Sequence, residues 1–410
     1  MSSPVWHPFT QHGLGEPIPL VTHASGALLH TADGRTIVDA ISSWWVTTHG
    51  HCHPRIMAAI AAQAQRLDQL IFAGWTHEPA EALARELVAL MPLTLTRVFY
   101  SDSGSTSVEV ALKMALGYWA HRGAPRHKII VMEHSYHGDT IGAMSVGARG
   151  VFNQAYEALL FDVVTVPFPA AGREQACYDA LQTACMADAA AFIVEPLVLG
   201  AGGMLMYPPA VLAQLRAICA AHDVLFIADE VMTGWGRTGT LLACEQAAVS
   251  PDILCLSKGL TGGSLPLAVT MASEPVYQAH YAPDRSKMFF HSSSYTANPL
   301  ACAAANANLA VWREEPVMAR IATLAARQAE RLEALPGAEN KRLCGTIAAC
   351  DLPGEAGYLA AAAPRLMAAA REAGLLLRPL GNTVYVMPPY CITEAELDLV
   401  YRVIDEAIAG

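Results

Sequence analysis

Short apolar runs alternate with amphipathic segments through the middle of the chain. Most of these runs are apolar at every position, as expected for strands that are covered on both faces. They lie at 97–102, 128–133, 163–168, 190–197, 224–231, 252–258 and 267–273, and helical patterns at 105–119, 174–186 and 208–222. The alternation predicts an α/β fold, with helices on both faces of a mostly parallel seven-stranded central sheet. The connection at 259–266 is too short for a crossover helix, so the last strand is expected to run antiparallel to its neighbour.

The two ends of the chain have a different pattern. Residues 1–50 are rich in loops and contain one hairpin-like stretch, whereas residues 313–410 alternate short helices and strands. A second hairpin is expected at 375–387, with its turn at Gly381. We expect both ends to form one smaller α+β domain beside a large domain at 51–312.

Composition excludes several classes of protein. The 410 residues carry 26 Lys and Arg against 37 Asp and Glu, which gives a net charge of −11. A protein that binds nucleic acid would need a basic face. The first basic residue is Arg35, so no secretory signal is predicted, and no apolar run approaches the roughly 18 residues of a membrane span. The ten cysteines form no C-x-x-C pair, which is typical of reduced thiols in a cytoplasmic protein.

Polar residues follow three of the expected strands, at the sheet edge where α/β proteins bind ligands. The first strand leads into Ser103-Gly104-Ser105-Thr106 and an apolar helix. The free N–H groups at the start of a helix, with the hydroxyls of Ser105 and Thr106, suit a phosphate group. The same residues also suit an ordinary serine-rich helix cap, so both interpretations stay open.

Asp229 and Lys258 end two further buried strands. A carboxylate in the position of Asp229 suits either a protonated ring nitrogen or a structural salt bridge. Only Lys258, of five lysines, ends a buried strand at the ligand edge. A desolvated lysine can form a Schiff base with an aldehyde. The alternative interpretation of Lys258 is an ordinary charged lysine at the surface. A phosphate cradle, a carboxylate and such a lysine are together what pyridoxal 5′-phosphate requires.

At this point the chain resembles the class III aminotransferases of the pyridoxal-phosphate fold-type I superfamily. The motifs that carry the resemblance are SDSGSTSVEVALKMA, SYHGDT, VEPLVLGAGGM, ADEVMTGWGRTG, PDILCLSKGLTGG and TANPLACAAA. Four further stretches are similar to the members that aminate 8-amino-7-oxononanoate in biotin synthesis: WHPFTQ, DAISSWWVTTHGHCHP, YHGDTIGAMSV and RPLGNTVYVMPPY. The resemblance implies a homodimer that binds pyridoxal phosphate and small-molecule substrates, with S-adenosylmethionine as the amino donor.

The resemblance also assigns roles around the cofactor. Lys258 would bind the cofactor covalently and then move a proton between the substrate and the cofactor. Asp229 would pair with the pyridine nitrogen, while Gly104 and Ser105 would bind the phosphate. Tyr136 would lie against the cofactor ring and border the substrate.

Three serines of the HSSS segment would act across the dimer interface. The resemblance implies that Ser293 and Ser294 reach the phosphate in the partner subunit. Ser292 would line the substrate pocket.

The remaining substrate residues are implied in the same way. Trp44 and Trp45 would form the wall for a long apolar substrate, and Arg378 would bind the substrate carboxylate, with Tyr385 nearby. Adjacent residues of a strand point to opposite faces, so we expect only one tryptophan to line the pocket and favour Trp44. Glu195 is left as a structural acid or a gate for an arginine, outside the expected site.

One departure from the family bears on the amino donor. Members that use S-adenosylmethionine often have a tyrosine before the proline of the N-terminal segment, and Ile18 is expected at that position here. Since isoleucine removes an aromatic hydroxyl from the donor pocket, lysine stays open as an alternative donor.

Two other functions are weighed. A metal site at the histidines of residues 49–53 is not expected, because no acidic partner is near them in the sequence. The stronger rival is another class III transaminase, acting on an ω-amino acid or a diamine.

Overall fold

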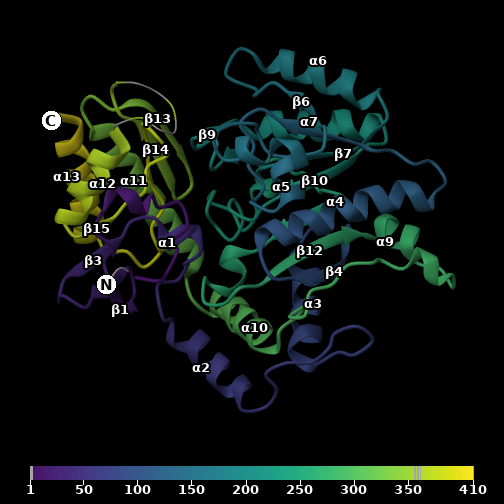
Figure 1. Ribbon diagram of the computed structural model, residues 1–410, viewed down its shortest axis with the longest axis horizontal. Coiled ribbons are helices and arrows are strands. Elements are labelled where there is room, and N and C mark those ends of the chain that lie inside the picture. The colour runs from purple at the N-terminus through teal and green to yellow at the C-terminus, as the bar shows by residue number, and fades with distance from the viewer. Residues whose placement is uncertain (1–2, 355–356, 358–359, 361, 410) are drawn as a thin grey trace.

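The computed structural model describes residues 3–354, 357, 360 and 362–409. Within them, seven strands form the predicted central sheet, in the order β4-β12-β11-β10-β7-β5-β6 (Figure 1). Their bounds are β4 (Leu95–Ser101), β5 (Lys128–Met132), β6 (Val164–Val166), β7 (Ala189–Val194), β10 (Leu225–Asp229), β11 (Ile253–Leu256) and β12 (Ala268–Ser273). β12 pairs antiparallel with both β11 and β4, and the other pairings are parallel. The predicted sheet and its one reversed strand are confirmed.

Helices cover both faces of this sheet, as the continuously apolar strands predict. Ile129 and Val131 of β5 pack in one core with α4 (Gly104–His121) and α9 (Glu274–His280). Ile130 and Met132 of the same strand face a second core, which includes residues of α3 (Glu78–Leu90), α6 (Glu174–Cys185) and α7 (Pro209–Ala221). Alternate residues of one strand therefore enter different cores. The shorter helices α5 (Ile141–Ser145) and α8 (Ala243–Gln246) and the strands β8 (Val198–Leu199) and β9 (Leu205–Met206) lie in the connections.

Both ends of the chain contribute to one small sheet beside the large one. Its order is β1-β2-β3-β15, with bounds β1 (Val21–Ser25), β2 (Leu28–Thr31), β3 (Thr36–Asp39) and β15 (Leu375–Leu376). A second small sheet joins β13 (Glu339–Cys344), β14 (Ile347–Asp351) and β16 (Thr383–Val386), next to α11 (Val317–Ala334), α12 (Ala362–Glu372) and α13 (Glu394–Ala409). Two further helices, α2 (Pro54–Ala64) and α10 (Pro299–Glu314), pack against each other below the large sheet. The domain boundaries at residues 50 and 312 stay a prediction.

The expected hairpin at 375–387 is wrong. β15 pairs with β3, and β16 pairs with β14, so the two strands belong to different sheets. Only Leu380 and Thr383 form a bridge across the turn. Pro379 has no N–H to donate to a ladder, so the chain changes sheet at this point instead of folding back.

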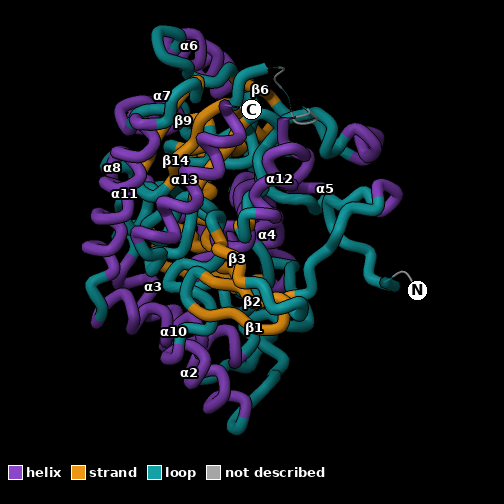
Figure 2. Tube along the Cα trace, turned by 90° about the vertical axis from the view of Figure 1, so that its left-hand side faces the viewer, coloured by secondary structure: helices purple, strands orange, loops and turns teal. Residues whose placement is uncertain are grey.

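The first described residues form an exposed arm. Figure 2 shows this arm leaving the body of the molecule toward the N-terminus. It carries large apolar side chains, among them Trp6, which is 89% exposed, and Leu14, which is 70% exposed. Among the described residues, no helix is both long enough and apolar enough to cross a membrane.

Candidate active site

The carboxyl edge of the central sheet borders a cavity of about 380 Å³. Asp229 is the last residue of β10, Lys258 follows β11 by two residues, and Gly104 begins the helix after β4. All three line this cavity together with Ser105 and Tyr136. The structure therefore brings together every cofactor residue that the sequence predicts within one subunit.

Lys258 presents its amine to the cavity beside an aromatic wall. Its Nζ atom lies 4.4 Å from the centre of the Trp45 ring, a cation–π distance. Burial lowers the pKa of Lys258 to about 8, although the negative charges of Asp229 and Glu195 oppose the shift. Within the described residues, Lys258 forms no hydrogen bond or ion pair through this amine. The nitrogen is thus available to react, and its neutral form is accessible near physiological pH.

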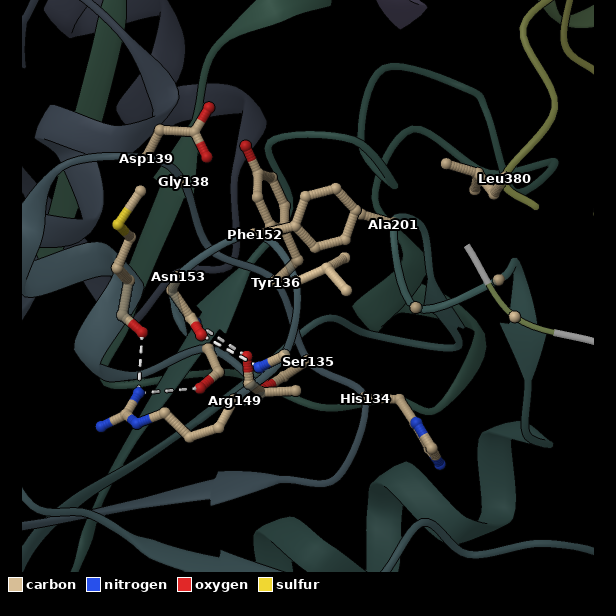
Figure 3. Close-up of a pocket in the computed structure, with 18 of the residues that line it drawn as sticks. His134, Ser135, Tyr136, Gly138, Asp139, Arg149, Phe152, Asn153, Ala201 and Leu380 are labelled. Carbon is tan, nitrogen blue, oxygen red and sulfur yellow. Dashed lines mark hydrogen bonds between the residues drawn. The ribbon is translucent and has the colours of Figure 1, made fainter. Parts of the chain in front are cut away.

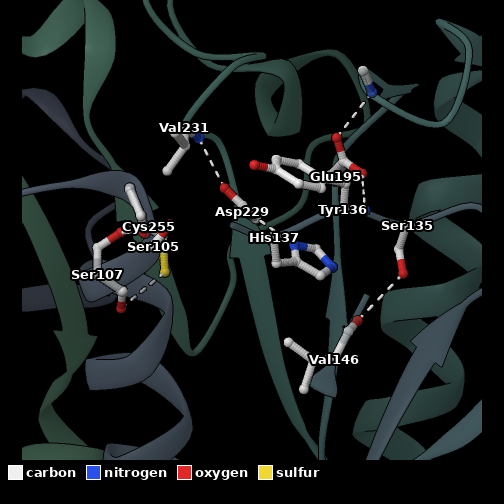
Figure 4. Close-up of polar contacts among 12 residues, drawn as sticks. Ser105, Ser107, Ser135, Tyr136, His137, Val146, Glu195, Asp229, Val231 and Cys255 are labelled. Carbon is white, nitrogen blue, oxygen red and sulfur yellow. Dashed lines mark hydrogen bonds and ion pairs between the residues drawn. The ribbon is translucent and has the colours of Figure 1, made fainter. Parts of the chain in front are cut away.

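The carboxylate of Asp229 is held from two sides. Oδ2 lies 2.7 Å from Nδ1 of the buried His137, and the backbone N–H of Val231 donates to Oδ1 at 3.0 Å (Figure 4). Nε2 of His137 has no hydrogen-bond partner among the described residues. Asp229 is 5% exposed and also lines the cavity, so it is fixed in position and placed to meet a cationic ring nitrogen.

The N-terminus of α4 offers backbone donors to the same cavity. Ser103 caps the helix by accepting from the N–H of Thr106, and the Thr106 hydroxyl accepts from the N–H of Ser103. Thr106 is therefore used for capping and does not line the cavity, unlike the expected cradle. A Cβ atom on Gly104 would lie 2.6 Å from Cγ1 of Val231, so only glycine lets the helix start approach this closely. This helix end suits an anion such as phosphate.

Both tryptophans line the cavity, so the expectation that only one does so is wrong. The segment that holds them, α1 (Ser42–Trp45), is not a strand, because Ser42, Ser43 and Trp45 have positive φ angles of 53°, 60° and 66°. The irregular backbone turns both rings to one side. Trp45 is buried edge-on to Tyr385, at 5.9 Å between ring centres, whereas Trp44 is 41% exposed.

Arg378 lines the cavity beside the aromatic rings of Phe9 and Trp44. Its guanidinium stacks 5.1 Å from the Trp44 ring and donates to the carbonyl oxygen of Phe9 at 3.1 Å. Among the described residues that line the cavity, Arg378 is the only arginine and Lys258 the only lysine. Tyr385 also lines this part, as the resemblance implies.

Phe9 is a wall residue that the sequence analysis missed. Its ring packs edge-on against Trp44 at 5.5 Å and against Phe152 at 6.1 Å. Ile18, in contrast, is 48% exposed and does not line the cavity, so the argument from Ile18 against S-adenosylmethionine loses its structural basis. The signal for Phe9 was its place in WHPFTQ, a motif that already carried the resemblance.

A second cavity of about 340 Å³ lies next to the first (Figure 3). Tyr136, Phe152 and Leu380 line both cavities, so the two spaces share part of their walls.

The serines of the HSSS segment and the histidines of residues 49–53 lie outside this cavity. Ser292, Ser293 and Ser294 do not line this cavity of their own subunit, and Ser292 and Ser294 are exposed. Their predicted role in a partner subunit stays a prediction. The histidines of residues 49–53 are divided among separate hydrogen bonds, and the described part of the chain contains no group of three or more potential metal ligands.

Glu195 is a second residue that the sequence analysis left out. It follows β7, is 5% exposed and lines the cavity with Lys258 and Asp229. The position of Glu195 at the end of an apolar strand was visible in the sequence. Its neighbours in the cavity follow three other strands, so the sequence alone could not show that they lie together.

Known proteins with similar sequences share nearly the whole chain. The family described as aminotransferase class-III matches residues 10–408. The adenosylmethionine-8-amino-7-oxononanoate aminotransferase of Synechococcus elongatus is 49% identical over 98% of both chains. The enzyme of the same name from Mycobacterium leprae is 39% identical over 96% of this chain and 92% of its own.

Solved structures agree with this relationship. The adenosylmethionine-8-amino-7-oxononanoate aminotransferase of Methanocaldococcus jannaschii superimposes with a TM-score of 0.94 at 33% identity, covering 99% of this chain and 97% of its own. An amine transaminase from an uncultivated Pseudomonas species, in its PLP-bound form, has the same TM-score at 31% identity and covers 100% and 99%. The chain belongs to the class III aminotransferases.

Proposed function

We propose that this protein transfers the amino group of S-adenosylmethionine to 8-amino-7-oxononanoate, with pyridoxal 5′-phosphate as cofactor. The observation that carries the proposal is one cavity that is lined by both a reactive amine, that of Lys258, and a cation, Arg378. An acceptor with a ketone and a distant carboxylate fits that arrangement. The names of the relatives at up to 49% identity support the same substrates.

The residues present fit the cofactor. Gly104 lets the start of α4 pack closely against Val231 at the cavity, and the helix start offers N–H groups to a phosphate. Asp229, backed by His137, matches a protonated ring nitrogen. Lys258 supplies the amine that captures an aldehyde. When bound, pyridoxal phosphate supplies an electron-withdrawing ring that makes a proton next to the substrate nitrogen acidic.

Proton transfer falls to Lys258. Its Nζ atom takes a proton from the carbon that carries the donor amine and returns one to the acceptor carbon. With a pKa near 8, this amine works in both directions close to neutral pH. The contacts with His137 and with the backbone N–H of Val231 hold the carboxylate of Asp229 in one orientation.

Substrate binding is assigned to other residues that line the same cavity. Arg378 binds the terminal carboxylate of the acceptor bidentately, in exchange for the carbonyl of Phe9. The rings of Trp44, Phe9 and Tyr136 contact the methylene chain and exclude water from the reacting end. Because donor and acceptor share one cavity, the first product leaves before the second substrate binds, and kinetics are ping-pong.

We also propose that the working form is a cytoplasmic homodimer with shared sites. Large apolar side chains are exposed near the HSSS segment, with Phe290 at 65% and Tyr295 at 64%. Ser293 and Ser294 do not reach the cavity of their own subunit, as expected if they complete the phosphate site of the partner. The ten cysteines are unpaired, which suits a reducing compartment.

A second candidate is an amine or ω-amino acid transaminase. Structural neighbours described as amine or ω-transaminases share 26–31% identity with TM-scores of 0.90–0.94. Arg378 and the paired tryptophans favour the long carboxylate-bearing acceptor over a simple amine.

A donor screen tests the proposal. The purified holoenzyme is given 8-amino-7-oxononanoate with S-adenosylmethionine, lysine or glutamate, and 7,8-diaminononanoate is measured by mass spectrometry. The diamine is expected with S-adenosylmethionine; formation only with lysine would reassign the donor. No diamine with any donor, alongside turnover of an ω-amino acid, would establish the second candidate instead.

A further inference from the structure

The carboxylate of Glu195 lies in the wall of the cavity without a cationic partner. Oε1 accepts from the backbone N–H of Tyr136 at 3.0 Å, and Oε2 accepts from the backbone N–H of Gly200 at 2.9 Å (Figure 4). Among the described residues, no lysine, arginine or histidine lies within ion-pair distance of it. Two backbone donors therefore orient this acid, and its charge is left for a ligand to compensate.

The titratable side chains that surround Glu195 come from several different strand ends. Asp229 lies at the end of β10, Lys258 follows β11, and Tyr136 and His137 follow β5. Burial raises the pKa of Glu195 to about 7, with the charge of His137 lowering it and that of Asp229 raising it further. Both protonation states are accessible near neutral pH, so a bound substrate can select one of them.

Other charged groups that border the cavity have separate positions. Arg378 approaches from the segment after β15, and Asp139 from the loop after β5. Tyr207 donates from its hydroxyl to the main-chain oxygen of Glu195 at 2.8 Å, so it fixes the backbone and not the carboxylate. Asp139 is exposed, whereas Glu195 is buried, so a charge on the substrate interacts more strongly with Glu195.

The two proposed substrates differ in charge at the atom next to the reacting carbon. The reacting carbon of S-adenosylmethionine carries a carboxylate. The reacting carbon of 8-amino-7-oxononanoate, C7, carries on one side the long chain to the carboxylate and on the other side C8 with its ammonium group. If the long chain runs to Arg378, the short substituent stays near Lys258 and is negative in the donor but positive in the acceptor.

We propose that Glu195 allows one cavity to accept both substrates, by pairing as a carboxylate with the C8 ammonium of the acceptor and as a neutral acid with the carboxylate of the donor. Binding of the donor then takes up one proton from solvent onto an Oε atom of Glu195. The same proton returns to solvent when the keto product leaves and the acceptor binds. This inference rests on the proposed function, since it uses the charges of those two substrates.

Acceptor preference tests the pairing with the ammonium group. The enzyme in its amino form is mixed with 8-amino-7-oxononanoate or with 7-oxononanoate, which lacks the ammonium group, and the half-reaction is followed by cofactor absorbance. The wild type is expected to prefer the amino compound by roughly tenfold or more in kcat/KM, as for a desolvated charge pair. Glu195→Gln is expected to lose most of that preference.

A matched control separates this role from general disturbance of the cavity. Asp139→Asn removes another carboxylate that lines the same cavity, and it is expected to keep the preference. Loss of the preference in Asp139→Asn but not in Glu195→Gln would overturn the proposal. Equal preference in the wild type and Glu195→Gln would overturn it as well.

The pH dependence of the donor half-reaction tests the neutral form and needs no variant. Between pH 5.5 and 8, KM for S-adenosylmethionine in the wild type is expected to rise as pH rises through about 7, because Glu195 becomes charged. In Glu195→Gln this rise is expected to vanish, with thermal unfolding confirming that the variant is folded. A KM in the wild type that is flat across pH 7 would overturn the proposal even if the variant does not fold. A wild type that reacts with neither substrate would instead contradict the proposed function.

Discussion

Only a few of the residues that line the cavity are charged, and their environments differ. Among the described residues, neither the buried amine of Lys258 nor the guanidinium of Arg378 forms an ion pair, and Arg378 donates to the backbone carbonyl of Phe9. Asp229 is fixed by two donors. Groups that lack strong internal partners are available to a ligand, whereas a fully paired group is not. In the proposed function, the chemistry of the site therefore rests on Lys258 and its selectivity on Arg378 and Glu195.

Replacing the reactive lysine gives the first prediction. Lys258→Ala is expected to lower kcat by at least about 10³-fold, because covalent capture and proton transfer both disappear. Lys287→Ala is the control, since that lysine donates to the carbonyl of His121 at 3.3 Å and does not line the cavity. Turnover is measured with intact folding checked by circular dichroism. Activity of Lys258→Ala close to that of the control would refute the mechanism.

The pKa of Lys258 gives a prediction for pH. Since burial lowers this pKa from 10.5 to about 8, the neutral amine is scarce below pH 8 and dominates above it. The rate at which the cofactor-free protein captures pyridoxal phosphate covalently is expected to rise from pH 6 to pH 8 and to level off near pH 9. Stopped-flow absorbance measures this rate. A rate that continues to rise steeply to pH 10 would mean that the amine is not desolvated.

The sequence was sufficient for some site residues and not for others. Lys258 and Asp229 could be found because each ends a buried strand, which places it at the ligand edge without further knowledge. Phe9 and Glu195 could not be ranked, because their partners lie far away along the chain. Phe9 meets Trp44, Phe152 and Arg378 only after both ends of the chain have folded together.

Among the elements, α4 and the loop after β5 meet where we expect the phosphate of the cofactor to bind. Gly138 in that loop has a φ of +129° and lies against Ser105, the second residue of α4. A Cβ atom at Gly138 would lie 2.9 Å from Cα of Ser105, which is closer than packed carbon atoms approach. The close contact of the two segments therefore depends on glycine.

This contact predicts a loss of cofactor affinity. Gly138→Ala is expected to weaken pyridoxal phosphate binding by about tenfold or more, because it displaces the start of α4 and strains the loop. Titration of the cofactor-free protein by fluorescence measures the dissociation constant. Gly123→Ala also replaces a glycine of positive φ, but it has no atom within 4 Å and lies away from the site, so its affinity should be unchanged. Equal affinities in both variants would contradict this account of the helix start.

Helices and strands were predicted correctly where the local sequence alone determines the secondary structure. The strands of the large sheet are continuously apolar, and that local signal was enough for their positions. The short connection at 259–266 was enough for the reversed direction of β12. The prediction for 375–387 was wrong because strand pairing there depends on distant parts of the chain. β15 pairs with β3, which lies more than 300 residues earlier in the sequence. Trp44 and Trp45 likewise face one side only because of an irregular backbone that their sequence does not reveal.

At the scale of the whole molecule, the cavity is built by both ends of the chain and the large sheet together. Pro8 and Phe9 come from the N-terminal arm, Arg378 and Tyr385 from the C-terminal part, and Lys258 from the sheet edge. The proposed dimer would add Ser293 and Ser294 from the partner subunit. A complete site then needs two copies of the chain.

Mixing two inactive variants tests the shared site. Subunits with Lys258→Ala are combined with subunits in which Ser293 and Ser294 are both alanine, and activity is measured at limiting pyridoxal phosphate. Each mixed dimer is expected to regain one site, which combines Lys258 of one subunit with the intact serines of the other. If the mixture is no more active than the two parents, the serines serve their own subunit or no site at all.

Transfer of the amino nitrogen itself tests the central claim most directly. The holoenzyme is supplied with S-adenosylmethionine labelled with ¹⁵N at its α-amino group and with unlabelled 8-amino-7-oxononanoate, and the product is analysed by mass spectrometry. The account predicts 7,8-diaminononanoate that carries one ¹⁵N, at C7. Diamine without the label, or no diamine while the label appears in another amine, would contradict it.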